Sequence, residues 1–306
     1  MTRMALCFGC YLLSILSAAA APLSVVDDQQ NEITLAAAPM RIVSLAPSNT
    51  ELLFALGLGE RVVGVTQFCN YPAAAGKIEP VAGFSDLSAE KIAAVRPDLV
   101  LASRGNDAEA LETVRQMDVP VFALANNTVA EVIESVRRLG RLTDRQEAAM
   151  VLAASLQARV DSVSRRVQLH SADERPGVLW AYVGDPIYTA GTGTIIDDVI
   201  QTAGGRNLGR EAGEGWPQVS LESVVDWRVD VLLTSLRLGE GTPAAAIETE
   251  LARMRGLDGW RQLPATKAGQ LVHVDADLLT RAGPRIVDAV EILAASLYPV
   301  SSGDRR

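Results

Sequence analysis

Three aromatic side chains and a cysteine share one long loop, and they are the first residues with the chemistry to bind something. The loop, QFCNYPAAAGKIEPVAGFSDLS, follows an apolar run, RVVGVT (61–66), that is typical of a buried strand. Its aromatic residues are Phe68, Tyr71 and Phe84, with Cys69 beside the first. Loops at the ends of parallel strands bind ligands, so this cluster predicts a ligand pocket. Packing beneath a long loop is the alternative for each ring.

Four residues could in principle ligate a metal. Cys69 is conceivable as a ligand of cobalt or iron, and Tyr71, Tyr182 and Tyr188 could each hold haem iron. A free cysteine is more often a small buried hydrophobe, and a tyrosine at a strand end is more often structural. We favour these structural interpretations for all four.

The sequence lacks the residues of a catalytic centre. It contains no HExxH, GxSxG, P-loop or Cys/His cluster that could supply a nucleophile or a metal. With His170 and His273 as the only histidines, a zinc site of histidine and cysteine is excluded. We therefore expect a binding protein, not an enzyme, and no cofactor of its own.

A Ser-x-Glu pattern occurs twice, once in each half of the chain. Aligning Ser88–Leu101 with Ser220–Leu233 pairs identical residues, namely Glu90 with Glu222, Arg96 with Arg228 and Asp98 with Asp230. The serine can cap a helix, the glutamate suits the positive end of the helix dipole, and the closing aliphatic run is typical of a buried parallel strand. One copy per half predicts two similar α/β lobes.

Other loops leave predicted strands on the same side as the aromatic loop. Arg104 and Gly105 follow the strand Leu99–Ser103, and the loop Asp275–Arg281 follows a final strand. The glycine-rich stretch 188–194 is neither a dinucleotide-binding motif nor a P-loop, so it predicts a tight turn at the pocket rim.

Helices must position these loops. Ser48 and Glu51 form a capping-box pattern that predicts a helix start. Between the two repeats, residues 143–169 contain no Gly or Pro and repeat apolar residues at helical spacing, which predicts a connecting helix of ~35–40 Å. We predict an α/β fold of two lobes, 21–142 and 170–306, each a mostly parallel sheet flanked by helices, joined by this helix, with a ligand cleft between them.

Charge and the first residues limit the function further. Acidic residues outnumber basic ones 37 to 28, which argues against a nucleic-acid partner. A positive start, an apolar core and small residues up to Ala21 indicate a secretory signal peptide, residues 1–20. The apolar core is shorter than the ~20 residues of a spanning helix, and no cysteine follows it for lipid attachment. We expect a soluble, monomeric protein in the periplasm, where Cys69 remains without a disulfide partner.

Several stretches together resemble a known family. They are SLAPSNTELLFALG, YPAAAGKIEPV, KIAAVRPDLVLASRG, TAGTGTIIDDVIQTAGGRNL, WPQVSLE and RAGPRIVDAV, with the helix-length connector between them. From about Arg41 to its end, the chain resembles the periplasmic substrate-binding proteins of ABC importers whose lobes are joined by one long helix, and most closely the cobalamin-binding members.

The resemblance implies a ligand held between the lobes by aromatic side chains. Carried over by position, its pocket residues are Phe68, Tyr71, Phe84, Arg104, Gly105, Trp216 and Asp277. Aromatic faces suit a corrin or porphyrin ring because they bury large flat apolar area. The implied function is capture of a corrinoid such as cobalamin and its delivery to the membrane permease. Phe84, Ser103 and Leu278 stand where the cobalamin-binding members carry Trp, so haem or a ferric siderophore is the alternative ligand.

The resemblance also gives the repeated glutamates a role. In such proteins a glutamate on each lobe docks onto arginines of the importer's membrane subunits, and Glu90 and Glu222 fall at those positions. The simpler interpretation, that both complement their helix dipoles, is compatible with docking.

Overall fold

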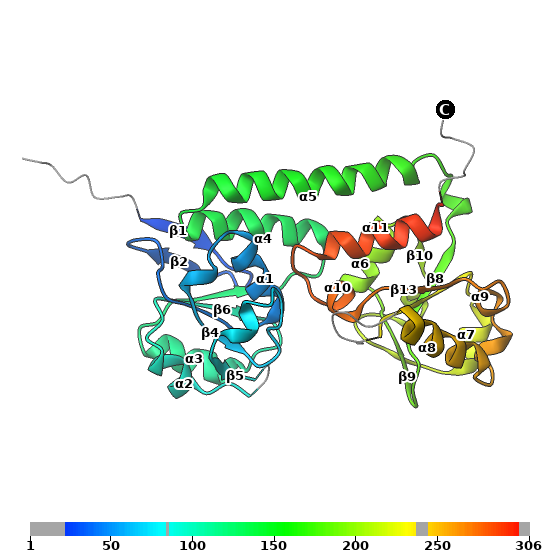
Figure 1. The fold of residues 1–306 in the computed structure, drawn as a ribbon, viewed down its shortest axis with the longest axis horizontal. Helices are drawn as coiled ribbons and strands as arrows, with labels where there is room; N and C mark the ends of the chain where they lie inside the picture. Colours follow the sequence, from blue (N-terminus) through cyan, green and yellow to red (C-terminus); the bar gives the residue numbers. More distant parts are fainter. Residues whose placement is uncertain (1–21, 84–85, 237–243, 300–306) are drawn as a thin grey trace, which may run out of the picture.

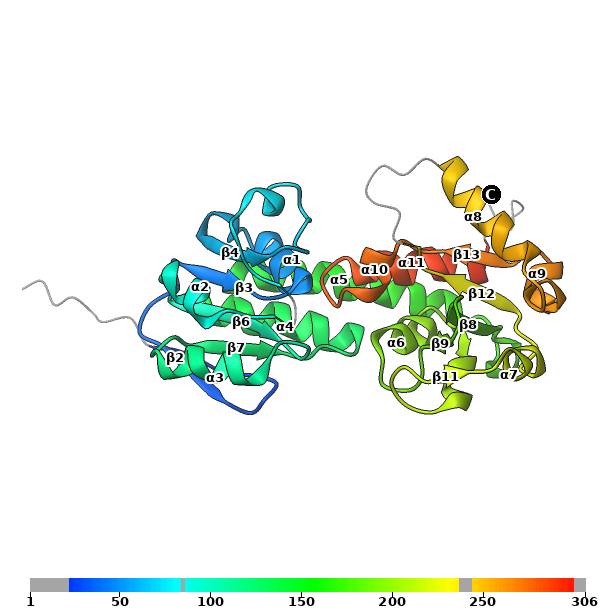
Figure 2. The same ribbon diagram turned by 90° about the horizontal axis from the view of Figure 1, so that it is seen from below.

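Two α/β lobes lie side by side and share one long helix. The computed structural model describes residues 22–83, 86–236 and 244–299, so the predicted signal peptide falls outside the described residues. Helix α5, Gln146–Val167, runs along both lobes on one side of the molecule (Figure 1) and passes behind both when the molecule is seen from below (Figure 2). The predicted fold class is confirmed.

The N-terminal lobe is built on a parallel sheet whose strand order is β5-β4-β3-β6-β7. Its strands are β3 (Ile42–Ser44), β4 (Val62–Thr66), β5 (Pro80–Ala82), β6 (Leu99–Ser103) and β7 (Val121–Leu124). Its helices are α1 (Pro47–Ala55), α2 (Ala89–Ala94), α3 (Ala108–Gln116) and α4 (Val129–Leu142). A hairpin of β1 (Leu23–Val26) and β2 (Glu32–Leu35) lies against α4. The central strands β3 and β6 are buried along almost their whole length because helices cover both faces of the sheet.

The C-terminal lobe has a mixed sheet with the order β11-β9-β8-β12-β13, and β10 pairs with β8. Its strands are β8 (Gly177–Tyr182), β9 (Ile187–Thr189), β10 (Arg206–Asn207), β11 (Gln218–Val219), β12 (Val231–Thr234) and β13 (Leu271–His273). Strands β9 and β11 are antiparallel to their neighbours, whereas β8, β10, β12 and β13 are parallel. Its helices are α6 (Ile195–Thr202), α7 (Leu221–Asp226), α8 (Ala244–Gly256), α9 (Pro264–Lys267), α10 (Ala276–Thr280) and α11 (Ile286–Leu297).

The two copies of the sequence repeat form equivalent corners of the two lobes. Each copy is a short helix that feeds a core strand, as predicted: α2 before β6 and α7 before β12. Ser88 and Ser220 cap these helices through their side chains. Arg96 and Arg228 follow them with positive φ angles of 46° and 51°, the left-handed conformation that often ends a helix.

The aspartates of the repeat bind the neighbouring strand. Asp98 accepts the Arg41 N–H at 2.8 Å at the entrance to β3. Asp230 accepts the Gly177 N–H at 2.7 Å at the start of β8. In both lobes the backbone N–H of the same aspartate donates back to the residue it binds. Most of the repeated residues therefore serve one local structure that occurs in both lobes.

Helix α5 belongs to an apolar core that extends through both lobes. Its buried side chains include Leu156 and Val163, which pack with N-lobe residues such as Leu139 and C-lobe residues such as Leu293. The helix contacts α4 of one lobe and α11 of the other. At 1.5 Å per residue its 22 residues span about 33 Å, slightly less than predicted. Among the described residues no helix combines the length and apolar composition needed to cross a membrane.

The capping box predicted at Ser48 is wrong. Helix α1 begins at Pro47 with Ala46 at the N-cap, and no side chain caps it. Proline suits the first helical position because its φ is already set and its missing N–H is not needed there. Glu51, the acidic partner of the predicted box, is buried and instead binds arginines of the other lobe.

Candidate ligand-binding site

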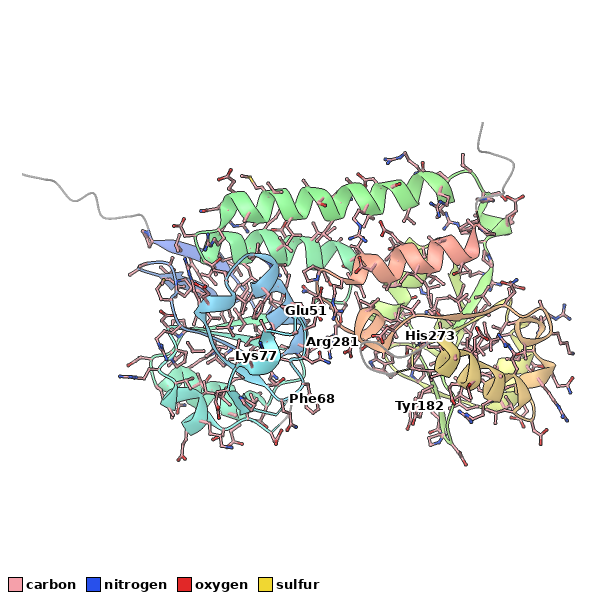
Figure 3. All side chains as sticks on the ribbon, in the orientation of Figure 1. Glu51, Phe68, Lys77, Tyr182, His273 and Arg281 are labelled. Atoms are coloured by element: carbon pink, nitrogen blue, oxygen red, sulfur yellow. The ribbon has the colours of Figure 1, made fainter. Side chains whose placement is uncertain are left out.

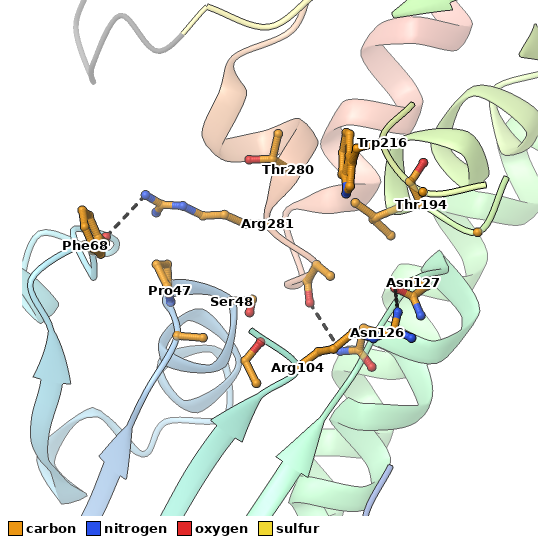
Figure 4. Close-up of a pocket in the computed structure, with 16 residues that line it drawn as sticks. Pro47, Ser48, Phe68, Arg104, Asn126, Asn127, Thr194, Trp216, Thr280 and Arg281 are labelled. Carbon is orange, nitrogen blue, oxygen red and sulfur yellow. Dashed lines mark hydrogen bonds between the residues drawn. The ribbon is translucent and has the colours of Figure 1, made fainter. Parts of the chain in front are cut away.

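A cavity of about 640 Å³ lies between the lobes (Figure 4). Its N-lobe wall consists of loops that follow the carboxyl ends of β3, β4, β6 and β7. Its C-lobe wall comes from the start of α6, the loop before β11 and the segment after α10. The lining residues are Ala46, Pro47, Ser48, Phe68, Ser103, Arg104, Asn126, Asn127, Gly193, Thr194, Ile195, Gly215, Trp216, Thr280, Arg281 and Ala282. Carboxyl ends of parallel strands are where such folds bind ligands.

Two aromatic rings border this cavity from opposite lobes. Phe68 is 43% exposed and Trp216 is 51% exposed, so both present apolar area that no residue in the described part of the chain covers. The Trp216 ring meets Trp180 edge to face, with centroids 5.5 Å apart. The Trp180 indole N–H in turn donates to the Ser235 hydroxyl at 2.8 Å. The C-lobe ring is therefore supported from behind while its face stays available to a ligand.

The two arginines of the cavity differ in their surroundings. Arg281 pairs with Asp277 at 2.8 Å and donates to the Asn70 side chain at 2.6 Å. Arg104 is exposed and donates to the Asn127 amide oxygen at 3.3 Å. Within residues 22–83, 86–236 and 244–299, no carboxylate pairs with Arg104. The cavity thus contains one neutralised cation and one that is open to an anionic group.

The opposite rim is formed by the glycine-rich stretch predicted as a tight turn. Thr194 caps α6 by accepting the Asp197 N–H at 3.1 Å, and its hydroxyl donates to the Gly191 carbonyl at 2.9 Å. Gly193 adopts a positive φ of 79°, which glycine accommodates without strain. Gly193 and Thr194 line the cavity, as expected for a rim.

A sequence comparison identifies the family. The model described as "Periplasmic binding protein" matches residues 42–278. The chain belongs to the periplasmic binding protein family.

Relatives of this binding protein include components of ABC transporters. It is 32% identical over 283 residues to an uncharacterized ABC transporter substrate-binding lipoprotein of Bacillus subtilis, covering 91% of this chain and 86% of that protein. It is also similar to the solved periplasmic vitamin B12 binding protein of Vibrio cholerae, with a TM-score of 0.73, 29% identity and coverage of 85% and 96%. The periplasmic heme-binding protein RhuT of Roseiflexus sp. RS-1 gives a TM-score of 0.71, 28% identity and coverage of 84% and 97%. The chain is thus a substrate-binding protein of the ABC-importer type and not an enzyme.

Three of the seven predicted pocket residues of this binding protein line the cavity, namely Phe68, Arg104 and Trp216. The other positions differ. Tyr71 packs against the Arg285 guanidinium, 3.6 Å from the ring centroid. Asp277 binds Arg281, and Gly105 is exposed without being part of the lining. Phe84 lies outside the described residues.

The conceivable metal ligands lie elsewhere. The Cys69 thiol is 4% exposed and sits 3.1 Å from the Thr50 hydroxyl, packed in the N-lobe core. Tyr182 and Tyr188 are exposed on β8 and β9 and do not line the cavity. In the part of the chain that the structure describes, no three His, Cys, Asp or Glu residues converge on a common point where a metal could bind.

Several lining residues were not predicted from the sequence. Asn126 and Asn127 belong to the loop that follows β7, so the rule that strand ends carry ligand-binding loops could have identified them. Arg281 falls at the end of the segment predicted as the loop Asp275–Arg281. That segment is a short helix, α10, because Asp275 caps it by accepting the Asp277 N–H at 2.8 Å.

Proposed function

We propose that this protein captures a corrinoid such as cobalamin in the periplasm and delivers it to the membrane permease of an ABC importer. The observation that carries this proposal is the pair of half-exposed rings, Phe68 and Trp216, on opposite lobes of one cavity. A flat macrocycle placed between them would cover apolar area that is otherwise open to water. The similarity to a vitamin B12 binding protein of the same fold supports this ligand class.

Haem is the second candidate, and the charge of the cavity favours it. Haem carries two carboxylates, whereas the periphery of cyanocobalamin consists mainly of neutral amides. Arg104 has no acidic partner among the described residues and could bind a carboxylate in a bidentate manner. The similarity to a heme-binding protein is consistent with this alternative. A ferric siderophore of the catecholate type, which is anionic, would use the same cation.

A titration separates these ligands. The mature protein, from about Ala21, is titrated with cyanocobalamin, cobinamide, haem and a ferric siderophore, followed by visible absorbance and calorimetry. Tight one-to-one binding of cyanocobalamin supports the proposal. If only haem or the siderophore binds, the corrinoid assignment is wrong, and if none of the four binds, the cavity holds another class of ligand.

The Arg104→Gln variant makes the comparison sharper. It should weaken binding of haem by about tenfold or more, the cost of a lost charge-assisted bond, and leave cyanocobalamin binding nearly unchanged. Arg137→Gln is the matched control, because Arg137 lies on α4 with its side chain 41% exposed and does not line the cavity.

We further propose that Glu90 and Glu222 dock onto the membrane subunits. Each is the second residue of a short helix, α2 or α7, and each side chain is exposed. The two helices belong to different lobes and lie on the side of the molecule away from α5 (Figure 1). A two-fold pair of permease subunits could therefore contact both glutamates at once.

A further inference from the structure

A buried glutamate of the N-lobe is held by two arginines of the C-lobe. Glu51, on α1, is 3% exposed. Its carboxylate accepts two hydrogen bonds from Arg285, at 2.9 and 2.6 Å, and pairs with Arg281 at 3.5 Å. Both arginines belong to the segment that connects α10 to α11. Figure 3 shows Glu51 and Arg281 where the two lobes meet.

The same arginines hold the loop that carries Phe68. Arg281 donates to the Asn70 side chain at 2.6 Å and to the Phe68 carbonyl at 3.4 Å. The Arg285 guanidinium stacks on the Tyr71 ring. This loop forms the aromatic N-lobe wall of the cavity. Arginines of the C-lobe therefore fix the position of the N-lobe loop that carries Phe68.

The contacts of Glu51 with the two arginines form only when the lobes lie at the spacing that the structure shows. A buried carboxylate that loses its cations is left with an uncompensated charge, which is strongly unfavourable. Although burial lowers the pKa of Arg285, its hydrogen bonds and attraction to Glu51 outweigh this effect and raise the pKa, so the Arg285 guanidinium stays charged. A second cavity of about 280 Å³, lined by Phe54, Tyr71 and Arg285 among others, lies beside these contacts. Apolar packing between the lobes is incomplete at this cavity, so the ionic contacts of Glu51 are what join the lobes beside it.

We propose that Glu51, Arg281 and Arg285 form an inter-lobe clamp that sets the spacing of the lobes and positions the Phe68 wall of the cavity. Helix α5 joins the lobes on the outside of the molecule, and the clamp joins them next to the cavity. Arg285 does not line the ligand cavity, so it is a positioning residue. The inference rests on the proposed cleft function only for its effect on affinity, because the lobe spacing exists without a ligand.

The lobe spacing is measured by pulsed electron resonance between spin labels at E90C and E222C in the mature protein, without ligand. The test variants are Glu51→Gln and Arg285→Gln. Arg138→Gln is the control, since Arg138 also pairs with a carboxylate, Asp28, and also lies over a ring, Phe122 at 5.8 Å, but entirely within the N-lobe. We expect one narrow distance distribution for the wild type and the control, and a broader one for both test variants. Distributions as narrow as that of the wild type in both test variants would overturn the clamp.

Affinity is the second readout, with cyanocobalamin and haem as probes. Glu51→Gln and Arg285→Gln should each lower the affinity for whichever probe binds by about tenfold, although neither variant changes Arg104. Arg138→Gln should leave this affinity unchanged. Arg285→Lys keeps the charge and should retain part of the affinity and of the narrow distribution. If Glu51→Gln does not fold, the contrast between Arg285→Gln and Arg285→Lys still tests the clamp. Wild-type affinity in both test variants would count against the clamp. If neither probe binds even the wild type, the ligand proposal fails while the distance measurement still decides the clamp.

Discussion

Trp216 combines exposure with support, which makes it the residue whose loss should affect binding most. Its ring is half exposed at the cavity and rests edge-on against Trp180. We expect Trp216→Ala to weaken ligand binding by about 2 kcal/mol, the scale of an aromatic anchor, and to change the free energy of unfolding little. Titration and urea denaturation measure the two effects.

Trp260 is the matched control for this substitution. It is 5% exposed in the C-lobe core and lies outside the cavity lining. Trp260→Ala should cost about 3–5 kcal/mol of stability. Unchanged ligand affinity in Trp216→Ala would show that the ligand does not use this ring.

Asp198 predicts a pH dependence of stability. Its carboxylate, on α6, accepts the Val129 N–H at the start of α4 at 2.8 Å and so joins the lobes. Burial raises the pKa of Asp198; the bond from Val129 opposes this rise, and the charges of Asp197 and Glu131 add to it. The folded protein therefore binds this proton more tightly than the unfolded chain does. The resulting stabilisation is fully present below the unfolded pKa and is lost as the pH rises through the folded pKa.

We therefore expect Asp198→Asn to stabilise the protein at pH 7–8. The neutral amide avoids the burial of charge, and its oxygen can still accept the Val129 bond. The advantage should vanish below about pH 4, where the wild-type carboxyl is protonated in both states. Thermal melts across this range test the effect, with Asp258→Asn as the exposed control. A larger advantage at low pH than at neutral pH would contradict the assignment.

Local residue types revealed only part of the site. Phe68 and Arg104 were predictable because they follow predicted strands, whereas Trp216 was expected only from the resemblance to the family. The role of Tyr71 was not predictable, because its arginine partner, Arg285, lies far away in the sequence. Asp277 pairs with Arg281, only four residues away, but the segment that carries both was predicted as a loop and is the helix α10. A pocket residue and a residue that supports the pocket look alike until the two lobes are placed together.

At the scale of elements, the repeated helix–strand units, α2–β6 and α7–β12, allow the same stability prediction to be tested in each lobe. Asp98→Ala should remove two backbone bonds, from Met40 and Arg41, and Asp230→Ala should remove one, from Gly177. Because these sites are exposed, we expect a cost of about 1 kcal/mol per bond in the free energy of unfolding. Urea denaturation of both variants is the measurement, with Asp226→Ala, at an exposed position of α7, as the control. Equal stability of Asp98→Ala and the wild type would show that the aspartates do not fix the strands.

Elements were predicted well where the signal is local. Strand β6 was predicted residue for residue, Leu99–Ser103, because a run of buried aliphatic residues has one reasonable assignment. Helix α4 begins with a local signal of the same kind, because the capping box of Thr128 with Glu131 forms at its start. The predicted capping box at Ser48 does not form because Glu51 binds Arg285, 234 residues away. A buried charge-assisted pair is stronger than the hydrogen bond of a helix cap.

At the scale of the whole molecule, three sets of contacts limit lobe movement. The apolar core is continuous along α4, α5 and α11; Asp198 bridges the lobes; and Glu51 holds both inter-lobe arginines. Large hinge closure requires a few free residues between domains, which this arrangement lacks. We expect small-angle scattering profiles of the ligand-free and ligand-bound protein to overlay, and a marked compaction on binding would contradict this.

A nearly rigid protein must be recognised by its importer mainly through surface residues on both lobes. Glu90 and Glu222 are suited to this recognition because each lobe presents a glutamate in the first turn of an exposed, serine-capped helix. The Glu90→Ala/Glu222→Ala double variant should bind ligand normally and lose importer-dependent uptake, since each lost interfacial ion pair costs roughly 1.5–3 kcal/mol, or tenfold or more in affinity. Uptake into proteoliposomes that contain the membrane subunits, alongside ligand titration, measures both properties.

The Glu109→Ala variant is the control that distinguishes a loss of docking from a loss of helix stability. It is also exposed and also the second residue of a capped helix, α3, so Glu109→Ala removes the same favourable interaction with a helix dipole. Uptake should survive in Glu109→Ala and fail in the double variant if Glu90 and Glu222 contact the permease. Equal uptake by the double variant and the wild type would leave the repeated glutamates with a structural role alone, and recognition would then have to lie elsewhere on the two lobes.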